Sequence, residues 1–269
     1  MSSPAVVWEH RNLIANLAKR DLKAKYKKSV LGWMWSLINP AATLAVYSFV
    51  FGIVLKGVAP LAGNGSLKAF PLYLFAGLVV WNLFSNTLTA VMDALEEAGE
   101  LLTKIYFPPE CPAFAAVLGV SLQGAIEFLI LLAVLVIVGN VSWTMLFVPL
   151  LLIAVIALAT GIGLVLSVLN IHYRDVSYIT TIAIQVLFYC TPIVYPLELI
   201  PGRLWGLPAR QLISMNPIAR CVMVIRDLVW HLRLPSLVDA LYVAGVSGAI
   251  FALGWAWFSS RAPRVIEEL

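Results

Sequence analysis

The chain has 269 residues, of which 61% are hydrophobic and 12% are charged, and its formal net charge is +4. With a mean hydropathy of +0.93, this composition excludes an ordinary soluble domain, whose surface needs more polar side chains to face water. No basic cluster recurs beyond residue 28, so a nucleic acid is not the expected partner. We therefore interpret the sequence as an all-α integral membrane protein.

The first predicted element is an amphipathic helix over residues 5–28. Residues 1–28 carry seven Lys and Arg side chains against Glu9 and Asp21, and each basic side chain near an anionic lipid surface contributes on the order of 1 kcal/mol. We expect this helix to lie along the cytoplasmic face of the membrane as an interface helix, with membrane lipids as its partner. The alternative is a solvated run of charge that only orients the first span.

Six apolar segments are predicted to cross the membrane, and most of them reach the ~20 residues that a ~30 Å hydrocarbon layer requires. Pro40 in the first segment removes a helical hydrogen bond and predicts a kink. Six spans place both termini on one side, and the basic first 28 residues place that side in the cytoplasm. The whole chain, 1–269, is expected to form a single transmembrane domain. The predicted spans are residues 33–55, 70–92, 113–138, 145–169, 179–195 and 237–258.

Two charged segments, residues 93–109 and 170–175, interrupt the apolar pattern on the cytoplasmic side. The first, DALEEAGELLTKIYFPP, is too polar to cross the membrane and is predicted to be a short helix that ends at its two prolines. Both segments are short and held between spans, which suits docking to a partner protein. Two solvated turns explain the same pattern equally well.

Residues 196–235 mix prolines with apolar runs too short to cross, so we expect two short re-entrant helices on the outer side. Asn216-Pro217 predicts a helix start, because proline suits the first helical position. An apolar stripe follows it at helical spacing: Ile218, Val222, Ile225 and Val229. Five arginines in this segment predict acidic or phosphate partners. They are Arg203, Arg210, Arg220, Arg226 and Arg233.

Glu127 and Gln185 stand out as polar residues within the spans. A carboxylate in the middle of a span costs roughly 2.5–3.5 kcal/mol if it faces lipid, so Glu127 needs a partner, water or a proton. Two readings stay open for each residue. It lines a substrate path, or it forms a hydrogen bond between helices, for which Gln123 is one candidate partner of Glu127.

Aromatic side chains gather near the predicted span ends and along the first, second and fifth spans. Such residues commonly anchor a protein in the membrane interface, but aromatic rings also stack on the apolar faces of sugar rings. A path lined by them would let a glycan slide without being held. The candidates are Tyr26, Trp33, Trp35, Tyr47, Phe51, Trp81, Phe84, Tyr189 and Tyr195.

Motifs for catalysis are missing from the sequence. No Gly-Lys pair occurs, which excludes the GxxxxGK[ST] loop that holds ATP phosphates, and no GxSxG motif is present. The scattered histidines suggest no metal site, and the three cysteines are expected to pack as apolar residues. We expect no catalysis, metal or cofactor in this chain. A metal-dependent polyprenyl-phosphate transferase is an alternative, and it would have to use the acids Asp93, Glu96, Glu97 and Glu100.

Five sequence blocks stand out, in this order along the chain: residues 20–40 (RDLKAKYKKSVLGWMWSLINP), 104–110 (KIYFPPE), 170–179 (NIHYRDVSYI), 191–196 (TPIVYP) and 215–227 (MNPIARCVMVIRD). In this order they resemble the membrane (permease) subunits of ABC-2 type exporters for cell-surface polysaccharides. That family includes the permeases for O-antigen, teichoic acid, capsule and galactan. The resemblance extends over nearly the whole chain.

The resemblance implies a multi-pass subunit of the cytoplasmic membrane that forms a homodimer and binds two copies of a separate ATPase subunit. That partner would hold ATP and Mg²⁺, which accounts for the missing phosphate loop. The substrate would be a lipid-linked glycan that passes through a channel between the two protomers. An exporter of a drug or a lipid with the same fold is the alternative.

The resemblance also implies roles for particular residues. In the first charged segment, coupling to the ATPase falls on Glu97, Glu100, Lys104 and Tyr106, and in the second on His172, Tyr173, Arg174 and Asp175. The channel falls on Trp33, Trp35, Tyr47, Phe51, Trp81, Phe84, Tyr189, Glu127 and Gln185. The outer gate falls on Asn216, Pro217, Arg220, Arg226 and Asp227. Trp33 and Trp35 are candidates for the point where the glycan enters from the cytoplasm. Arg220 or Arg226 either contacts the pyrophosphate of the lipid carrier or pairs with Asp227 and Glu198.

Overall fold

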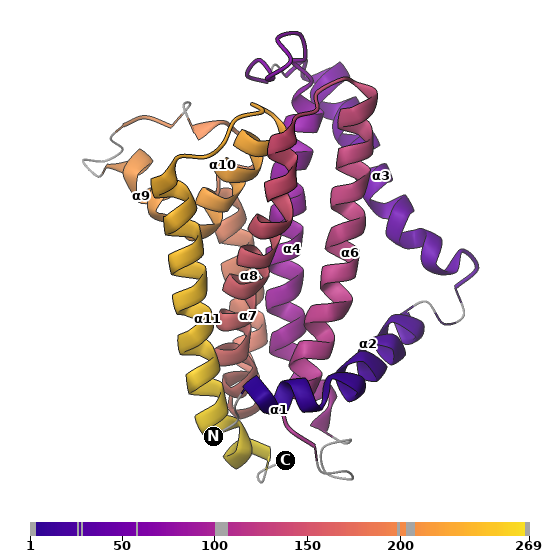
Figure 1. The fold of residues 1–269 in the computed structure, drawn as a ribbon, viewed down its shortest axis with the longest axis vertical. Helices are drawn as coiled ribbons and strands as arrows, with labels where there is room; N and C mark the ends of the chain where they lie inside the picture. The colour runs from indigo at the N-terminus through magenta and orange to yellow at the C-terminus, as the bar shows by residue number, and fades with distance from the viewer. Residues whose placement is uncertain are drawn as a thin grey trace.

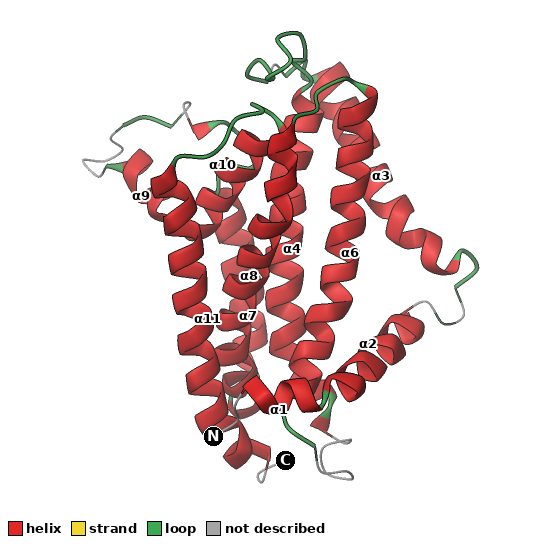
Figure 2. Cartoon of the chain, viewed as in Figure 1, coloured by secondary structure: helices red, strands yellow, loops and turns green. Residues whose placement is uncertain are grey.

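The computed structural model describes residues 4–25, 27, 29–57, 59–99, 107–197, 200–202 and 208–266. Within these ranges the chain is built mainly from helices, and the connections gather at the two ends of a bundle (Figure 2). This architecture confirms the predicted all-α membrane protein. The helices are α1 (Pro4–Glu9), α2 (Arg11–Lys25), η1 (Gly32–Met34), α3 (Trp35–Tyr47), η2 (Ser48–Val54), α4 (Phe70–Glu97), α6 (Glu110–Ile137), η3 (Trp143–Phe147), α7 (Val148–His172), α8 (Asp175–Tyr189), α9 (Ala209–Met215), α10 (Pro217–Val229) and α11 (Leu237–Ile266).

Five stretches of the described chain are long and apolar enough to cross a membrane. They are Gly32–Val54, Phe70–Glu97, Glu110–Ile137, Trp143–His172 and Leu237–Ala262. The apolar helix α8 is shorter, with 15 residues, which gives it a length of about 22 Å. The predicted count of six spans therefore depends on how α8 is counted, and it stays a prediction.

Both chain ends approach the same end of the bundle. Figure 1 shows α4, α6, α7, α8 and α11 standing upright, with α1 and α2 lying across the end at which α11 finishes. We call this the terminal end. α9 and α10 lie at the opposite end, which we call the far end (Figure 1). The amphipathic N-terminal segment and the short helices before α11 thus occupy opposite ends of the molecule.

The core is built around α4, which is buried over most of its length. Phe75, Ala76, Val79 and Val80 are each no more than 1% exposed. Helix α7 packs against α4 on one side and against α11 on the other. Glycines bring α7 and α11 close together, because a Cβ atom on Gly161 would lie 2.5 Å from the Ile250 carbonyl oxygen. Small residues at such crossings let helix backbones approach closely in membranes.

Two helices contribute little to this core. α3 buries only Ser36 and Pro40, and α8 buries only Thr180. Pro40 lies inside α3, and the helix continues through it before changing to a π-helical segment, η2. Both helices therefore present apolar surface outward, and Figure 1 shows α3 leaning away from the upright helices.

Three predicted elements need correction. The N-terminal helix is two helices, with a turn at His10 between α1 and α2. Asp93 belongs to α4 rather than to a separate short helix, because the sequence DALEE consists mostly of good helix formers that extend the span. The fifth predicted span, 179–195, instead starts at Asp175 and ends at Tyr189. The reason is Pro192, which lacks an N–H group and disfavours helical geometry in the residue before it.

Candidate functional site

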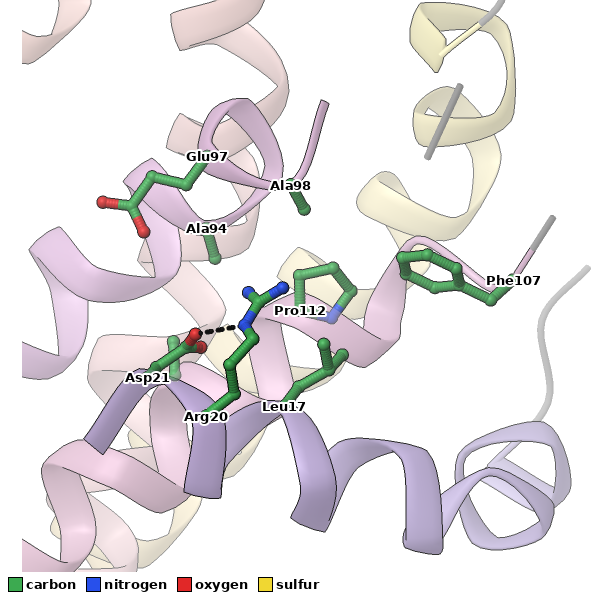
Figure 3. A pocket seen from close by; sticks show the side chains of 9 residues that line it. Leu17, Arg20, Asp21, Ala94, Glu97, Ala98, Phe107 and Pro112 are labelled. Atoms are coloured by element: carbon green, nitrogen blue, oxygen red, sulfur yellow. Dashed lines mark hydrogen bonds and ion pairs between the residues drawn. The ribbon is translucent and has the colours of Figure 1, made fainter. Parts of the chain in front are cut away.

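At the terminal end, α2 packs against the bundle through its apolar face. Ile14, Leu17 and Ala18 are buried in a cluster with residues of α4, α6, α7 and α11. Beside this contact, Figure 3 shows a small pocket lined from three elements, in which the Arg20 guanidinium bonds Asp21 at 2.9 Å. α2 is therefore a fixed part of the bundle as well as a carrier of exposed basic side chains.

A larger cavity of about 190 Å³ lies between α2, α4 and α6. Its polar lining comes from Asp21 and Lys25 of α2, Asp93 and Glu97 of α4, and Gln123 of α6. Lys25 Nζ donates a hydrogen bond to Gln123 Oε1 at 2.8 Å. Gln123, the candidate partner of Glu127, therefore bonds α2 instead, and Glu127 bonds a different residue.

Glu127 lies inside the bundle and is bonded to a neighbouring helix. Its residue is 5% exposed, and its Oε2 accepts a hydrogen bond from Asn82 Nδ2 of α4 at 3.1 Å. Because a carboxylate in a span is costly without a partner, this bond explains how α6 tolerates it. Glu127 therefore links α6 to α4. Its role in a substrate path stays a prediction.

The two charged segments predicted for coupling meet at the terminal end. Asn170, at the end of α7, is 3% exposed, and its Nδ2 donates to Glu96 Oε2 of α4 at 2.9 Å. Next to this link the chain exposes Glu97 on α4 and residues 172–175 between α7 and α8. The backbone of Tyr173 is extended and ends α7, and its side chain is 65% exposed. Three further coupling candidates, Glu100, Lys104 and Tyr106, lie outside the described residues.

The aromatic channel candidates divide into an exposed and a buried group. Trp33, Trp35 and Tyr189 are 54%, 40% and 66% exposed. Trp81 and Phe84 are 6% and 2% exposed, and Trp81 packs edge-on against the Phe188 ring with centroids 5.4 Å apart. Their assignment to the channel needs correction, because side chains this deeply buried in one chain belong to its core.

Two other channel candidates, Tyr47 and Phe51, are half-buried at the far end. The Phe51 ring lies 5.9 Å from the Tyr47 ring and 5.5 Å from that of Phe70 on α4. These contacts fasten the end of the first apolar stretch to the core. Gln185, by contrast, is exposed on α8. The predicted channel side chains therefore do not form one continuous surface within a single chain.

α10 begins as the sequence predicts. Asn216 caps the helix, since its side chain accepts a hydrogen bond from the Ile218 N–H at 3.1 Å, and Pro217 occupies the first turn. The predicted stripe is completely inside the protein. Ile218, Val222, Ile225 and Val229 are each 0% or 1% exposed. This helix start and its buried face are confirmed.

Arg226 is the centre of a contact between α10, α4 and the chain that follows α8. The residue is 3% exposed. Its Nη1 and Nη2 donate hydrogen bonds of 2.6 Å to the carbonyl oxygens of Pro192 and Ile193. The guanidinium carbon lies 3.9 Å from the ring centroid of Tyr73 on α4. A contact between Arg226 and the pyrophosphate of a lipid is wrong for this structure, because the guanidinium is buried and bonded to the protein.

The other arginines of this region pair with partners that the sequence did not indicate. Arg220 forms an ion pair with Asp239 at the start of α11, and its guanidinium lies over the Tyr242 ring at 5.1 Å. Asp227 pairs with Arg233 at 2.8 Å. The predicted pairing of Arg220 or Arg226 with Asp227 is therefore wrong, and Glu198 lies outside the described residues. Arg220 instead fastens α10 to α11.

Comparison with known families explains this combination of elements. Residues 12–228 match the model of the ABC-2 type transporter family. The match covers well over half of the chain. This chain belongs to the ABC-2 type transporter family. The expectation drawn from the five sequence blocks is thereby confirmed at the level of the family.

The relatives of this ABC-2 type transporter align over 93% to 98% of its length. It is 25% identical over 269 residues to the O-antigen export system permease protein RfbA of Myxococcus xanthus, with 98% of this chain and 97% of the relative covered. The identity to RfbA of Klebsiella pneumoniae is 27% over 263 residues, covering 96% and 95%. The polysialic acid transport protein KpsM of Escherichia coli is 23% identical over 251 residues, covering 93% of each chain.

In this transporter the end of α10 is held by two loops at the far end. Asn140 Nδ2 donates to the Val229 carbonyl oxygen at 2.8 Å, and Thr144 Oγ1 donates to that of Leu228 at 2.7 Å. The Gly63 N–H donates to the Trp230 carbonyl oxygen at 2.8 Å. The last carbonyls of a helix have no partner within it, so these bonds fix the end of α10. These contacts could not be predicted from the sequence, because a bond to a distant backbone carbonyl leaves no local pattern.

The cysteines and acids show no grouping for chemistry in the described part of this transporter. Cys111 and Cys221 are buried, as expected, whereas Cys190 is exposed. Burial raises the pKa of the Cys221 thiol to about 12, so this thiol stays protonated and unreactive. Among the described residues no three His, Cys, Asp or Glu side chains are placed to hold a metal ion. Glu96 bonds Asn170 and Asp93 faces the cavity beside α2, so these two acids serve different contacts.

Proposed function

We propose that this chain is the permease subunit of an ATP-driven exporter that moves a lipid-linked cell-surface polysaccharide across the cytoplasmic membrane. The observation that carries the proposal is the similarity, over 93% to 98% of the chain, to permeases named for O-antigen and polysialic acid export. Because the similarity runs from one end of the bundle to the other, the same architecture is available here for the same class of cargo.

α8 offers the surface best suited to a passing glycan. Tyr178, Ile182, Gln185 and Tyr189 follow one another at i, i+4, i+7 and i+11, which places them on one face of the helix. All four are exposed, and we call this face the α8 stripe. Its phenol rings stack on sugar rings, and its amide bonds their hydroxyls. Tyr178 was not predicted as a site residue from the sequence, although its spacing of 11 residues from Tyr189 places both on one helix face.

A second copy of the chain completes the path in this proposal. The α8 stripe and the exposed Trp33 and Trp35 are open to one side in a single chain. A symmetric dimer that brings two such surfaces face to face encloses a channel lined from both protomers. The homodimer also covers apolar surface of α3 and α8 that the core leaves exposed.

The terminal end supplies the contact with a separate ATPase. Glu97 and the exposed residues 172–175 project beside the Glu96 to Asn170 link, so the two segments are held together as one docking surface. Two copies of a soluble ATPase, which hold ATP and Mg²⁺, would bind the two protomers there. The basic side chains of α2 at the same end favour the cytoplasmic side for it, and the far end then faces outward.

The test is transport in vesicles that contain the permease and its ATPase partner. Export of the lipid-linked glycan should require ATP and should stop when the catalytic base of the partner is replaced. Arg174→Glu should lower the stimulation of ATP hydrolysis by about tenfold or more, since a reversed charge in a docking surface opposes the partner. Arg261→Glu, an exposed charge at the same end of α11, is the matched control and should leave stimulation within about twofold.

Three results would contradict parts of the proposal. Undiminished export with the inactive ATPase would remove ATP as the energy source. Normal stimulation with Arg174→Glu would remove residues 172–175 from the docking surface. Transport of a drug or a free lipid in place of the glycan would assign the chain to the other substrate class of the same fold.

A further inference from the structure

The helix α8 is attached to the protein in an uneven way. Along its 15 residues only Thr180 is buried, but the three residues that follow Cys190 are completely enclosed. Thr191 and Ile193 are both 0% exposed, and Pro192 is buried as well. We call residues 191–193 the 191–193 turn. The body of α8 is therefore loosely packed, while the point where the chain leaves it is fixed.

Arg226 fixes the 191–193 turn through the backbone. Its two Nη atoms donate to two successive carbonyl oxygens, those of Pro192 and Ile193, at 2.6 Å each. A guanidinium is a planar group with several N–H donors, so this double contact sets both the position and the orientation of the 191–193 turn. The turn is also joined to the end of α8, because Thr191 Oγ1 donates to the Leu187 carbonyl oxygen at 2.7 Å.

The Arg226 guanidinium is in turn held against the rigid core. It lies 3.9 Å from the Tyr73 ring of α4, and a Cβ atom on Gly77 would come within 3.2 Å of its Nη2. Glycine at position 77 thus leaves the space that the guanidinium fills. Since α10 is buried on its apolar face and bonded at its end by Asn140 and Thr144, Arg226 stands on a helix with little freedom to move.

The opposite end of α8 is the end at which force would be applied. The extended backbone of Tyr173 separates α8 from α7, and residues 172–175 are exposed. Residues at the ends of elements commonly absorb the backbone changes of a hinge motion. α8 is joined to α7 only through Tyr173 and Arg174, so a displacement applied there, with the other end of α8 held, turns the helix about the held end.

We propose that the 191–193 turn, held by Arg226, is the pivot about which α8 swings during transport, and that Arg226 is a positioning residue for this motion. The inference rests on the proposed function, since the ATPase partner supplies the displacement at residues 172–175. The swing carries the α8 stripe toward or away from the glycan path while the far end of α8 stays in place. Arg226 itself makes no contact with the substrate.

A pair of distance measurements tests the pivot in the complex of permease and ATPase. A spin label on the native, exposed Cys190, paired with one on Leu241→Cys of α11, reports on the far end of α8. A label on Ile179→Cys, paired with Leu253→Cys in a Cys190→Ser background, reports on the terminal part. All these positions are exposed. Each complex should carry one labelled permease copy, diluted with unlabelled copies, so that only distances within one chain are read.

The pivot predicts unequal shifts between the nucleotide-free complex and one trapped with ATP. At a rise of 1.5 Å per residue along the helix axis, Ile179 lies about 15 Å before Tyr189, the last residue of α8, whereas Cys190 directly follows Tyr189 beside the 191–193 turn. The Ile179 to Leu253 distance should therefore change several times more than the Cys190 to Leu241 distance. Equal shifts at the two positions would overturn the pivot, and so would the absence of any shift in vesicles that export glycan. Loss of all ATP-dependent export in the unmodified complex would instead overturn the proposed function on which the inference rests.

Arg226→Lys provides the second readout, because a lysine keeps the charge but cannot reach two carbonyl oxygens as a planar fork. We expect export to fall roughly tenfold while ATP hydrolysis continues, and the Cys190 to Leu241 distance to change with nucleotide. Arg233→Lys, on an exposed arginine paired with Asp227, is the control and should behave as the unmodified protein. Equal losses of hydrolysis and export in Arg226→Lys, with a fixed Cys190 distance, would mean a structural role only. If the Arg226→Lys permease fails to assemble with the ATPase, the two distance changes measured with Arg226 in place still test the pivot.

Discussion

Helices α4 and α7 and helices α3 and α8 have similar apolar compositions but very different surroundings. In the first group, side chains such as Val79 and Leu164 are 0% exposed, and glycines bring the backbones of α7 and α11 together. In the second group, residues such as Ile182 and Phe49 of the adjoining η2 are 62% and 58% exposed. The difference divides the chain into a closely packed frame, with α4 and α7 at its centre, and outward-facing helices.

The polar contacts follow the same division. Within the frame, polar side chains bond neighbouring helices to one another. Asn82 of α4 bonds Glu127 of α6, and Asn170 of α7 bonds Glu96 of α4. On α8 the exposed Gln185 and Tyr189 are left facing outward. The proposed function assigns different tasks to the two parts, with the packed helices as support and the α8 stripe as the surface offered to the glycan.

The largest expected effect comes from closing the gap between α7 and α11. In Gly254→Ala the new Cβ atom would overlap the backbone of Gly161, which has no side chain that could move aside. The two helices would have to separate, at a cost of about 1–3 kcal/mol or more. We expect a markedly lower melting temperature of the purified protein and little assembled permease in membranes.

Gly245→Ala is the matched control for this change. Gly245 lies on the same helix, and a Cβ atom there has no neighbour within 4 Å. Its melting temperature should equal or slightly exceed that of the unmodified protein, since alanine is the better helix former. A melting temperature of Gly254→Ala equal to that of the control would show that the frame is less rigid than the contacts imply.

An intermediate effect is expected from the α8 stripe, where function rather than stability should change. The double variant Tyr178→Ala and Tyr189→Ala removes two rings that are 73% and 66% exposed. Each exposed substitution should alter the unfolding free energy by less than about 0.5 kcal/mol, but loss of sugar stacking should lower export several-fold. The measurement is glycan export in vesicles beside a thermal melt of the same preparation.

Ile179→Ala on a neighbouring face of α8 is the control for the stripe. Ile179 is 64% exposed but lies beside the aligned positions 178, 182, 185 and 189. It should leave export close to that of the unmodified permease. Equal export by the double variant and the control would assign Tyr178 and Tyr189 to the anchoring of the helix in lipid.

How much of this arrangement could be predicted from the sequence depends on the range of the interaction. The start of α10 was predictable, because Asn216, Pro217 and the stripe that follows lie within a few residues of one another. The partner of Arg220 was not, since Asp239 lies 19 residues away across the connection to α11. The two hydrogen bonds from Arg226 to the carbonyl oxygens of Pro192 and Ile193 could not be predicted either, because backbone carbonyls carry no residue-specific signal.

The burial of two aromatic residues of α4 had a signal in the sequence. Polar side chains recur at helical spacing and mark one face of the helix, at Asn82, Ser85, Asn86, Thr89 and Asp93. Trp81 and Phe84 lie off that face, but they were assigned to a channel as aromatic residues, whereas the packing of α7 and α10 around α4 buries them. On α8, the exposed stripe became recognisable only once the single buried residue, Thr180, had identified the face toward the bundle.

The smallest effect is expected from chemical labelling of the cysteines, which measures the exposure of α8 and of the packed helices without changing the sequence. Cys190 is exposed at the end of α8, whereas Cys111 and Cys221 are buried in the frame. Thiolate is the reactive form, and burial raises the pKa of the Cys221 thiol to about 12. A maleimide should therefore modify the exposed Cys190 and leave Cys221 unmodified even at pH 9, because pH 9 is still far below the pKa of Cys221. Mass spectrometry of the folded permease should find one label per chain, with an unchanged melting temperature. Labelling of Cys221 at pH 9 would mean that α10 leaves its site often enough to reach solvent, and it would count against a fixed α10 as the support of the pivot.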